Sequence, residues 1–391
     1  MLRSLALALV VLLFVAVLYA GHAYLATRLV LDTGLADPWR GLALAAIATG
    51  GVLLVLEPIG ERTLPPHRLR LLAWPAALWM GFAFVLIVLL AATDAVLWFA
   101  GSPALAAGAA DLAEATSGTR AAGVLLVTLG ACGVALREGL RPPRLVRESF
   151  TIERWPRALD GFRIVQISDI HIGPLLDRRF AAHLVERVNA LEPDLIAVTG
   201  DLVDGSARHL EAEVAPFAGL RARHGVYFVT GNHDHLSDAR SWAAAVADLG
   251  MTVLRNRHVR IGEGEASFDL VGVDDHRGGM IGGGGEDLPA ALAGRDPERP
   301  AVLLAHDPST FRRARHEAVD LQLSGHTHGG QIWPFRYVVR LVIPWVAGRY
   351  RDGRAQLYVS RGTGFWGPPM RLLAPAEITE ITLRGEVPTA L

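Results

Sequence analysis

Residues 163–173 read RIVQISDIHIG, a short apolar run that passes directly into a polar cluster. The β-branched residues of Arg163–Ile167 predict a buried strand, and Asp169 and His171 follow where that strand ends. Four more stretches have the same form, a strand-like run and then Asp, Asn or His: Leu195–Thr199 with Gly200-Asp201, Val226–Thr230 with Gly231-Asn232-His233-Asp234, Ala301–Ala305 with His306-Asp307, and Leu321–Ser324 with Gly325-His326-Thr327-His328. Ligands of open α/β sheets lie at the carboxyl ends of the strands, so we expect the five clusters to meet at one place.

The side chains in these clusters suit divalent metal ions. Carboxylate, imidazole and amide groups bind Mn, Fe, Zn or Mg, and the only cysteine, Cys132, lies far from the clusters in the chain. Two such ions about 3.5–4 Å apart can clamp a phosphoryl group. A pair of ions needs a bridging carboxylate, and Asp201 is the natural candidate because it ends a strand directly after Gly200. The prediction is therefore a centre with two divalent metal ions.

The ordered set of clusters closely resembles the calcineurin-like metallophosphoesterase family, whose pattern runs D-x-H, G-D, G-N-H-D/E, H and G-H-x-H. The stretches SDIHIG at 168–173 and GHTHGGQI at 325–332 look like the bacterial membrane-anchored branch of that family. The resemblance covers roughly Phe162 to Leu383. It implies an α/β fold, an αββα sandwich, and a metal-dependent phosphoesterase, that is, a hydrolase.

The resemblance also implies a role for each polar residue. The first metal would be held by Asp169, His171 and His328, the second by Asn232, His306 and His326, and Asp201 would bridge both. His233 would be the catalytic acid that protonates the leaving group, and Asp234 would orient His233. Every ligand position matches the family pattern, which favours an active enzyme.

Three other polar residues near the clusters have no place in the pattern. For Asp204, a surface loop is favoured over a position that supports a ligand. For His276, in Asp274-Asp275-His276, a structural turn is favoured over a metal ligand. For His235, a contact with substrate is the less favoured interpretation.

The first 140 of the 391 residues differ sharply in composition from the rest. The mean hydropathy of +0.31 averages over this division. Four apolar segments predict an all-α transmembrane region: Leu2–Ala20, Gly41–Leu56, Leu71–Ala92 and Ala121–Leu136. A span needs about 20 residues, so the second and fourth segments must extend into their flanks. A buried soluble bundle is disfavoured because stretches such as Phe82–Ala92 are apolar on all sides.

We therefore predict a transmembrane helical region over residues 1–140, a linker over residues 141–160 and a metallophosphoesterase domain over residues 161–391. Arg141-Pro-Pro-Arg-Leu145 marks the linker, because paired prolines cannot continue a helix. In the domain, further strands are expected at Phe268–Val273, Ala355–Ser360 and Glu377–Leu383, and helices at Leu176–Leu191, Leu210–Leu220, Asp238–Leu249 and Asp287–Ala293. Residues 278–285 are expected to form a flexible glycine-rich loop.

The arginines predict the orientation in the membrane. With four spans, one side carries Arg3, Arg62, Arg68, Arg70, Arg137, Arg141, Arg144 and Arg147, and the other side Arg28, Arg40 and Arg120. The larger set indicates an inner (plasma) membrane protein with a cytoplasmic catalytic domain. Two alternatives stay open. A signal peptide over Leu2–Ala23 would leave three spans and the same final side, whereas a further helix within Val96–Ala110 would reverse it.

The predicted partners are the lipid bilayer and a phosphate ester. A net charge of −1 and the lack of basic runs interleaved with aromatic residues disfavour nucleic acid. Between Gln331 and Tyr350 the sequence is aromatic and basic, which suits either a membrane surface or core packing. We expect hydrolysis of a phosphodiester or pyrophosphate bond in a lipid-linked or membrane-proximal substrate, such as the UDP-2,3-diacylglucosamine of related bacterial hydrolases. The alternatives are a phosphodiesterase for soluble nucleotides and a non-catalytic membrane sensor of phosphate or lipid.

Overall fold

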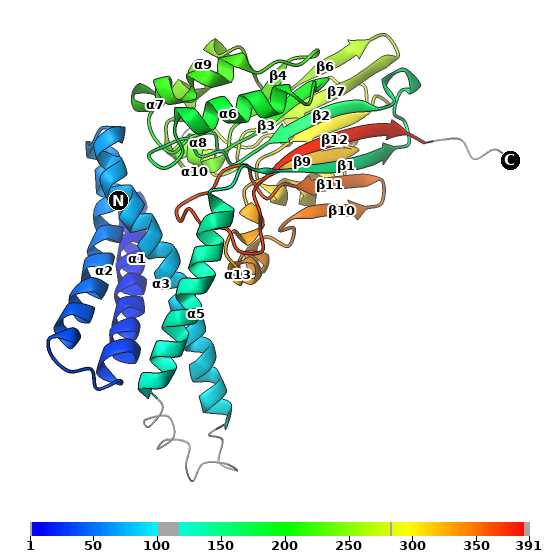
Figure 1. Cartoon of the computed structure of the whole chain (residues 1–391). Coiled ribbons are helices and arrows are strands. Elements are labelled where there is room, and N and C mark those ends of the chain that lie inside the picture. Colours follow the sequence, from blue (N-terminus) through cyan, green and yellow to red (C-terminus); the bar gives the residue numbers. More distant parts are fainter. Residues whose placement is uncertain (1, 101–116, 282–283, 387–391) are drawn as a thin grey trace. The chain divides into compact units, whose positions relative to one another are not determined.

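A computed structural model describes residues 2–100, 117–281 and 284–386 (Figure 1). These residues form two compact units. The helical unit comprises the chain up to Arg137 together with Gly367–Pro369. The α/β unit comprises Glu138–Trp366 and the chain from Met370 onward.

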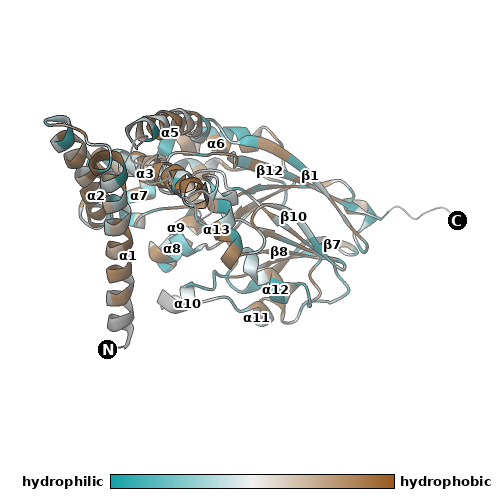
Figure 2. Ribbon diagram, turned by 90° about the horizontal axis from the view of Figure 1, so that it is seen from below, coloured by the Kyte–Doolittle hydropathy of each residue, from teal (hydrophilic) through white to brown (hydrophobic). Residues whose placement is uncertain are grey.

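Within the described residues, the helical unit contains four long apolar helices. They are α1 (Leu2–Ala26), which continues as the π-helix η1 (Thr27–Leu31), α2 (Trp39–Thr63), α3 (Pro66–Ala100) and α5 (Ser117–Gly139). Each is long and apolar enough to cross a membrane, and Figure 2 shows them predominantly in the hydrophobic colour. The prediction of four apolar helices is confirmed. Residues 101–116 lie outside the described residues, so the end of the Val96–Ala110 stretch is not described.

Several polar side chains of the helical unit pair across its helices. Asp94 of α3 accepts hydrogen bonds from Tyr24 Oη of α1 (2.7 Å), Arg28 Nε of η1 (2.9 Å) and Arg120 Nη1 of α5 (2.5 Å). Trp79 Nε1 of α3 donates to Nε2 of His22 in α1 (3.0 Å). Charged groups in spanning helices are costly unless paired, so these contacts hold α1, α3 and α5 together.

The α/β unit is built on two six-stranded sheets among the described residues. The first has the order β1 (Arg144–Ile152), β12 (Glu377–Gly385), β2 (Phe162–Ile167), β3 (Leu195–Thr199), β4 (Val226–Val229) and β5 (Thr252–Val253). The second has the order β10 (Gly348–Asp352), β11 (Ala355–Val359), β9 (Leu321–Ser324), β8 (Ala301–Leu304), β7 (Ala266–Gly272) and β6 (Arg257–Glu263). The strands β2, β3 and β4 pair in parallel, as do β7, β8 and β9. Within each sheet, the carboxyl ends of these strands therefore lie at the same edge.

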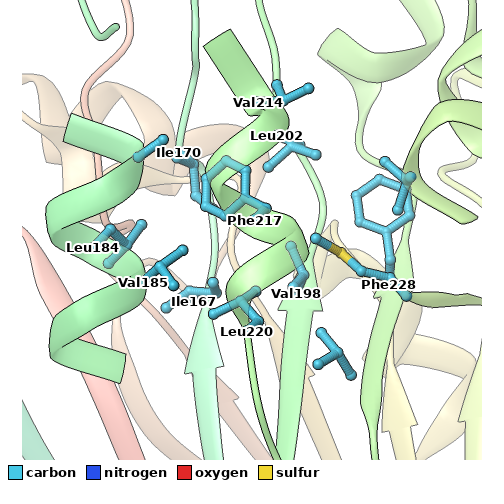
Figure 3. Close-up of a cluster of buried hydrophobic side chains, with 14 of the residues drawn as sticks. Ile167, Ile170, Leu184, Val185, Val198, Leu202, Val214, Phe217, Leu220 and Phe228 are labelled. Carbon is cyan, nitrogen blue, oxygen red and sulfur yellow. The ribbon is translucent and has the colours of Figure 1, made fainter. Parts of the chain in front are cut away.

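Alternate residues of the strands enter two different cores. In β2, Val165 and Ile167 face a core covered by helices, whereas Phe162 and Ile164 face the second sheet. Figure 3 shows the helix-covered core, where Leu184 and Val185 of α6 (Arg178–Asn189) lie beside Ile167. This core also includes side chains of α7 (Ala207–Val214), η3 (Ala215–Gly219) and α9 (Ala239–Asp248).

A further core lies on the outer face of the second sheet. It includes Val271, Leu303 and Leu288, from β7, β8 and α11 (Leu288–Leu292). Helix-covered cores therefore flank the two stacked sheets, and the αββα sandwich is confirmed. The shorter elements of the unit are η2 (Arg157–Leu159), α8 (Asn232–Leu236), α10 (Gly278–Ile281), η4 (Pro308–Thr310), α12 (Phe311–Ala314), η5 (His328–Gly330) and α13 (Phe335–Val342).

Some boundaries differ from those expected. Residues 141–160, assigned to a linker, contain β1, which pairs in parallel with β12 from Arg144 to Ile152. The helix expected over Leu210–Leu220 divides into α7 and η3, because Pro216 lies in the first turn of η3. In the glycine-rich stretch, residues 278–281 form α10 and residues 282–283 lie outside the described residues.

Candidate metal centre

The structure brings the five polar clusters together at the carboxyl ends of the strands. Asp169 and His171 follow β2, Asp201 follows β3, and α8 follows β4. His306 follows β8, and the pair His326 and His328 follows β9. The two sheets thus contribute to one site, as the parallel strand order requires.

The ligand atoms lie in two adjacent groups. In the first, Nε2 of His171 is 3.1 Å from Nε2 of His328, and Asp169 completes the group. In the second, Nε2 of His306 is 3.1 Å from Oδ2 of Asp201 and 3.2 Å from Nδ1 of His326. Asp201 Oδ2 is also 3.9 Å from His171 Nε2, so this carboxylate lies between the two groups.

Buried atoms that lack partners fit a pair of cations. Asp169 Oδ2 and Asn232 Oδ1 are buried and have no hydrogen-bond partner among the described residues. Buried polar atoms are nearly always paired, and a metal ion would supply the missing partner for both. Two pairs of imidazole nitrogens face one another at about 3 Å, and a metal ion between the rings of each pair would accept both lone pairs. The oxygen and nitrogen donors suit Mn, Fe, Zn or Mg.

An unusual backbone conformation orients five of the proposed ligands. Five of them adopt positive φ angles, which non-glycine residues rarely do: Asp169 (51°), His171 (54°), Asp201 (51°), His326 (70°) and His328 (50°). Each such residue costs about 1–3 kcal/mol, and strain of this kind clusters at functional sites. Backbone hydrogen bonds between loops hold the conformation, for example from Asp169 N to Gly200 O (3.0 Å).

Two glycines allow the loops that carry the proposed ligands to lie in direct contact with one another. A Cβ atom on Gly231 would overlap Oδ1 of Asp201, and one on Gly325 would overlap Oδ2 of Asp169. A larger residue at either position would displace a ligand. This is the physical reason for glycine in the Gly231-Asn232 and Gly325-His326 pairs.

Hydrogen bonds select the nitrogen that each histidine presents. His306 Nδ1–H donates to the carbonyl of Thr199 (2.8 Å), and His171 Nδ1–H donates to Asp204 (3.0 Å). In both residues Nε2 is left with a lone pair directed into the site. Neighbours that hold the second nitrogen in this way are typical of metal-binding histidines.

At three of the proposed ligands, electrostatics favour the protonation state that metal binding needs. Burial and the nearby charges of His171 and Arg371 hold the pKa of His328 well below its usual value. Burial, together with the charge of His306, lowers the pKa of His326 to about 4. Burial alone would raise the pKa of Asp201, but the charges of the surrounding histidines hold it well below the usual value. Neutral imidazoles and an ionised carboxylate are the forms that bind metals.

Asp204 contacts two histidines of the site, which the favoured interpretation of the sequence did not anticipate. The expectation of a surface loop is wrong, because Asp204 Oδ1 lies 2.8 Å from Nδ1 of His233 and 3.0 Å from Nδ1 of His171. Burial lowers the pKa of His233, but the charges of Asp201 and Asp204 outweigh it and raise that pKa to about 9. The signal available in the sequence was the short spacing from Asp201, on the loop that follows the same strand.

Asp234 does not have the partner that was expected. Its carboxylate accepts hydrogen bonds from the backbone amides of Gly231 (2.8 Å), Asp201 (2.9 Å) and Leu202 (2.9 Å). The orientation of His233 therefore comes from Asp204, and Asp234 instead ties the loop after β4 to the loop after β3. The carboxylate turns toward these amides because α8 begins at Asn232 and places it over the end of β3.

The remaining histidines near the site make other contacts. His235 is buried, and its Nε2 lies 3.0 Å from Oγ1 of Thr230. His276 is exposed and lies with Asp275 and Asp307 in a third group of possible ligand atoms. Oδ2 of Asp307 is also 3.7 Å from Nε2 of His326, so this group adjoins the second group of ligand atoms.

Comparison with known proteins assigns the family. The profile of the calcineurin-like phosphoesterases matches residues 162–330. An uncharacterized metallophosphoesterase of Helicobacter pylori is 35% identical over 263 residues, which cover 67% of this chain and 69% of that protein. Another, of Aquifex aeolicus, is 34% identical over 246 residues, which cover 61% and 92% of the two chains. The chain therefore belongs to the calcineurin-like metallophosphoesterase family.

Animal proteins are also among the relatives of this chain. A Bos taurus transmembrane protein with metallophosphoesterase domain is 39% identical over 278 residues, or 68% of this chain. The match covers 63% of the bovine protein, so the chain spans less than two thirds of that relative's length. Among solved structures, a dimetal phosphatase from Danio rerio covers 58% of this chain and 100% of that one, at 12% identity and a TM-score of 0.37. The family assignment rests on the sequence relatives. With its four candidate spans, this family member is an integral membrane protein.

Proposed function

We propose that this protein is a two-metal phosphoesterase that hydrolyses a phosphodiester or pyrophosphate bond. One observation carries the proposal. Imidazole nitrogens and carboxylate oxygens from five strand ends lie together, and two buried oxygens among these residues, Asp169 Oδ2 and Asn232 Oδ1, lack hydrogen-bond partners among the described residues. Asp169, His171 and His328 would hold one ion, Asn232, His306 and His326 the other, and Asp201 both. Two bound ions would polarise the phosphoryl oxygens and supply an activated water as nucleophile.

The chain's own contribution to bond cleavage is a proton from His233. With Nδ1 held by Asp204, this imidazole is left with Nε2 free for the leaving-group oxygen. Its side chain is 18% exposed, so it lies at the mouth of the site rather than beneath it. A positioned general acid contributes about 10²–10⁴-fold to the rate.

The proposed substrate is lipid-linked or membrane-proximal, of the kind represented by UDP-2,3-diacylglucosamine. Four candidate spans precede the site in the same chain, and the SDIHIG and GHTHGGQI stretches favour the bacterial membrane-anchored branch. We place the transmembrane region over residues 1–140 and the metallophosphoesterase domain over residues 161–391, with the connection over residues 141–160 adding β1 to the first sheet of that domain. The distribution of arginines supports a cytoplasmic location for that domain.

A second candidate substrate class is soluble nucleotides. Trp366 is 51% exposed, and its ring centroid lies 5.4 Å from that of His233. An indole beside the general acid offers a surface on which a nucleobase could stack. In this case the spanning helices would serve only as an anchor.

The test is turnover by the purified full chain with Mn, Zn, Mg or Fe added in turn. The panel contains a diacylated sugar nucleotide, phospholipid diesters, soluble nucleotide diesters and an aryl phosphodiester. We expect metal-dependent hydrolysis with the highest kcat/KM on a substrate that carries acyl chains. A preference for soluble nucleotides would support the second candidate, and metal binding without turnover of any ester would indicate a sensor.

A further inference from the structure

Helix α13 presents an apolar face to solvent within the α/β unit. Every residue of this helix is at least partly exposed. The exposed fractions are large for apolar side chains: Phe335 43%, Tyr337 57%, Val338 52%, Leu341 86% and Val342 72%. The apolar face of an amphipathic helix is normally buried in a protein core, whereas Val338, Leu341 and Val342 of this helix are each more than half exposed.

Neighbouring residues continue the apolar surface beyond α13. Trp333 is 42% exposed and precedes the helix, and its backbone N–H donates to the carbonyl of Leu372 (3.1 Å). Leu373, the next residue of that segment, is 75% exposed. We call α13 together with Trp333, Trp366 and Leu373 the α13 surface.

The α13 surface adjoins the metal centre. Gln331 Nε2 donates to the carbonyl of Trp366 (2.9 Å), and the Trp366 ring lies beside His233. The turn that carries the ligand His328 also packs on the helix, because a Cβ atom on Gly330 would overlap the backbone of Arg336. Through Trp366 and the turn of His328, the exposed apolar side chains therefore lie next to the proposed general acid and a proposed metal ligand.

The charges of α13 identify the kind of partner. The helix reads FRYVVRLV, with two arginines and no acidic residue. Arg336 and Arg340 are exposed and lie one turn apart, on the side of the helix away from Phe335 and Val342. Aromatic and aliphatic side chains on one face, with basic side chains beside them, are typical of helices that lie in the interface of anionic membranes.

The connection to the spanning helices makes a bilayer available. The last candidate span, α5, ends at Gly139, and β1 begins at Arg144. A residue of extended chain covers at most about 3.6 Å, so the five steps from Gly139 to Arg144 span no more than about 18 Å. A bilayer is therefore always within reach of the α/β unit, without any second protein.

We propose that the α13 surface docks on the bilayer, with an anionic phospholipid interface as its ligand. Val338, Leu341 and Val342 enter the interface, and Arg336 and Arg340 contact phosphate groups of the lipids. If the proposed phosphoesterase function holds, on which this consequence rests, docking brings the mouth of the metal centre to headgroup level. A substrate could then reach the site while its acyl chains remain in the leaflet.

The first test measures the depth of α13 without any need for turnover. Spin labels are attached at Leu341→Cys, at Arg340→Cys and, as a control at an exposed position of α7, at Glu211→Cys, each in the full chain with Cys132→Ala. The protein is placed in nanodiscs of phosphatidylcholine with and without phosphatidylglycerol. We expect the Leu341 label to be accessible to oxygen and shielded from a water-soluble relaxation agent, and the Glu211 label to show the reverse. The Arg340 label should lie closer to water than the Leu341 label.

Two outcomes would overturn the proposal. One is equal exposure of the Leu341 and Glu211 labels to the water-soluble agent. The other is a Leu341 label shielded from both agents, which would mean that protein covers the helix, either the spanning helices or a second copy.

A second test uses Leu341→Asp and compares two substrates. The loss of kcat/KM on a lipid-embedded ester should be about tenfold or more, the factor expected when one leucine no longer enters an apolar phase. Hydrolysis of a soluble aryl phosphodiester should be unchanged, which also shows that the variant is folded. Equal losses on both substrates would contradict docking. A protein inactive on every ester would refute the proposed function but leave the depth measurement valid.

Discussion

Replacing Asp204 with asparagine removes one negative charge from the proposed general acid while keeping an oxygen that accepts hydrogen bonds. In the structure this carboxylate lies 2.8 Å from Nδ1 of His233, and the side chains of His233 and Asp204 are only 18% and 19% exposed. The amide oxygen of the new asparagine could still accept the hydrogen bond from His171 Nδ1, so metal content should persist in the Asp204→Asn protein. The expected change is therefore confined to the protonation of His233.

The size of the effect follows from the geometry. Two unit charges about 4 Å apart interact by about 1 kcal/mol in water and about 4 kcal/mol at an effective dielectric constant of 20. Partial exposure puts the pair between these limits, at roughly 1.5–3 kcal/mol, and one pKa unit corresponds to about 1.4 kcal/mol. The pKa of His233 should therefore fall by about 1–2 units in the variant. A general acid must be protonated, so the high-pH limb of the rate profile should move down by the same amount.

The assay is kcat/KM against pH for an ester with a poor leaving group. At a pH below the His233 pKa of both proteins, kcat/KM of the variant should match that of the wild type. At a pH above the His233 pKa of both proteins, kcat/KM of the variant should be lower by about 10–100-fold. Asp160→Asn, at a carboxylate 47% exposed and outside the metal centre, is the matched control. An unchanged high-pH limb would refute the pairing of Asp204 with the acid, and loss of metal would mean that Asp204 acts mainly through His171.

Two further predictions concern the acid and the membrane. His233→Ala should retain both metals and lose about 10²–10⁴-fold in kcat/KM on an alkyl or nucleotide ester, but far less on a nitrophenyl ester, because a stable phenolate needs no proton. Equal losses on both esters would show that His233 only positions the substrate. A reporter that is active only in the cytoplasm, fused after Leu391, should be active, as the arginine distribution predicts. Labelling of Gly279→Cys by an impermeant reagent in intact cells, with Cys132→Ala, would reverse the assigned side.

The buried parallel strands and the clusters after them could be predicted because both leave local signals. The strand β3 is buried at every residue and β2 at every residue except Arg163, so both appear as predominantly apolar runs. Edge strand β1 has only two buried residues, Phe150 and Ile152, and its charged residues resemble a linker. Residues with such a weak local pattern form a strand only because they pair with β12, which lies more than 200 residues later in the chain.

The features that the sequence did not reveal depend on contacts between loops. Asp204 reaches His171 and His233 because the loops after β2 and β3 pair at Ile172 and Val203. That contact joins segments about 30 residues apart, and the acid itself resembles any loop aspartate. The exposure of α13 is similarly invisible in its sequence, since the same amphipathic pattern describes a helix packed on a core.

The central claim is a catalytic centre with two metal ions bridged by Asp201. The most direct measurement is metal content by elemental analysis, with turnover of an aryl phosphodiester, for the purified wild-type chain and for Asp201→Asn. We predict two ions per wild-type chain with metal-dependent turnover, and fewer than two ions with no turnover in a variant that stays folded by circular dichroism. Two ions retained in an inactive Asp201→Asn protein would contradict the bridging assignment, and a wild-type chain that holds two ions yet hydrolyses no ester would contradict the claim of catalysis.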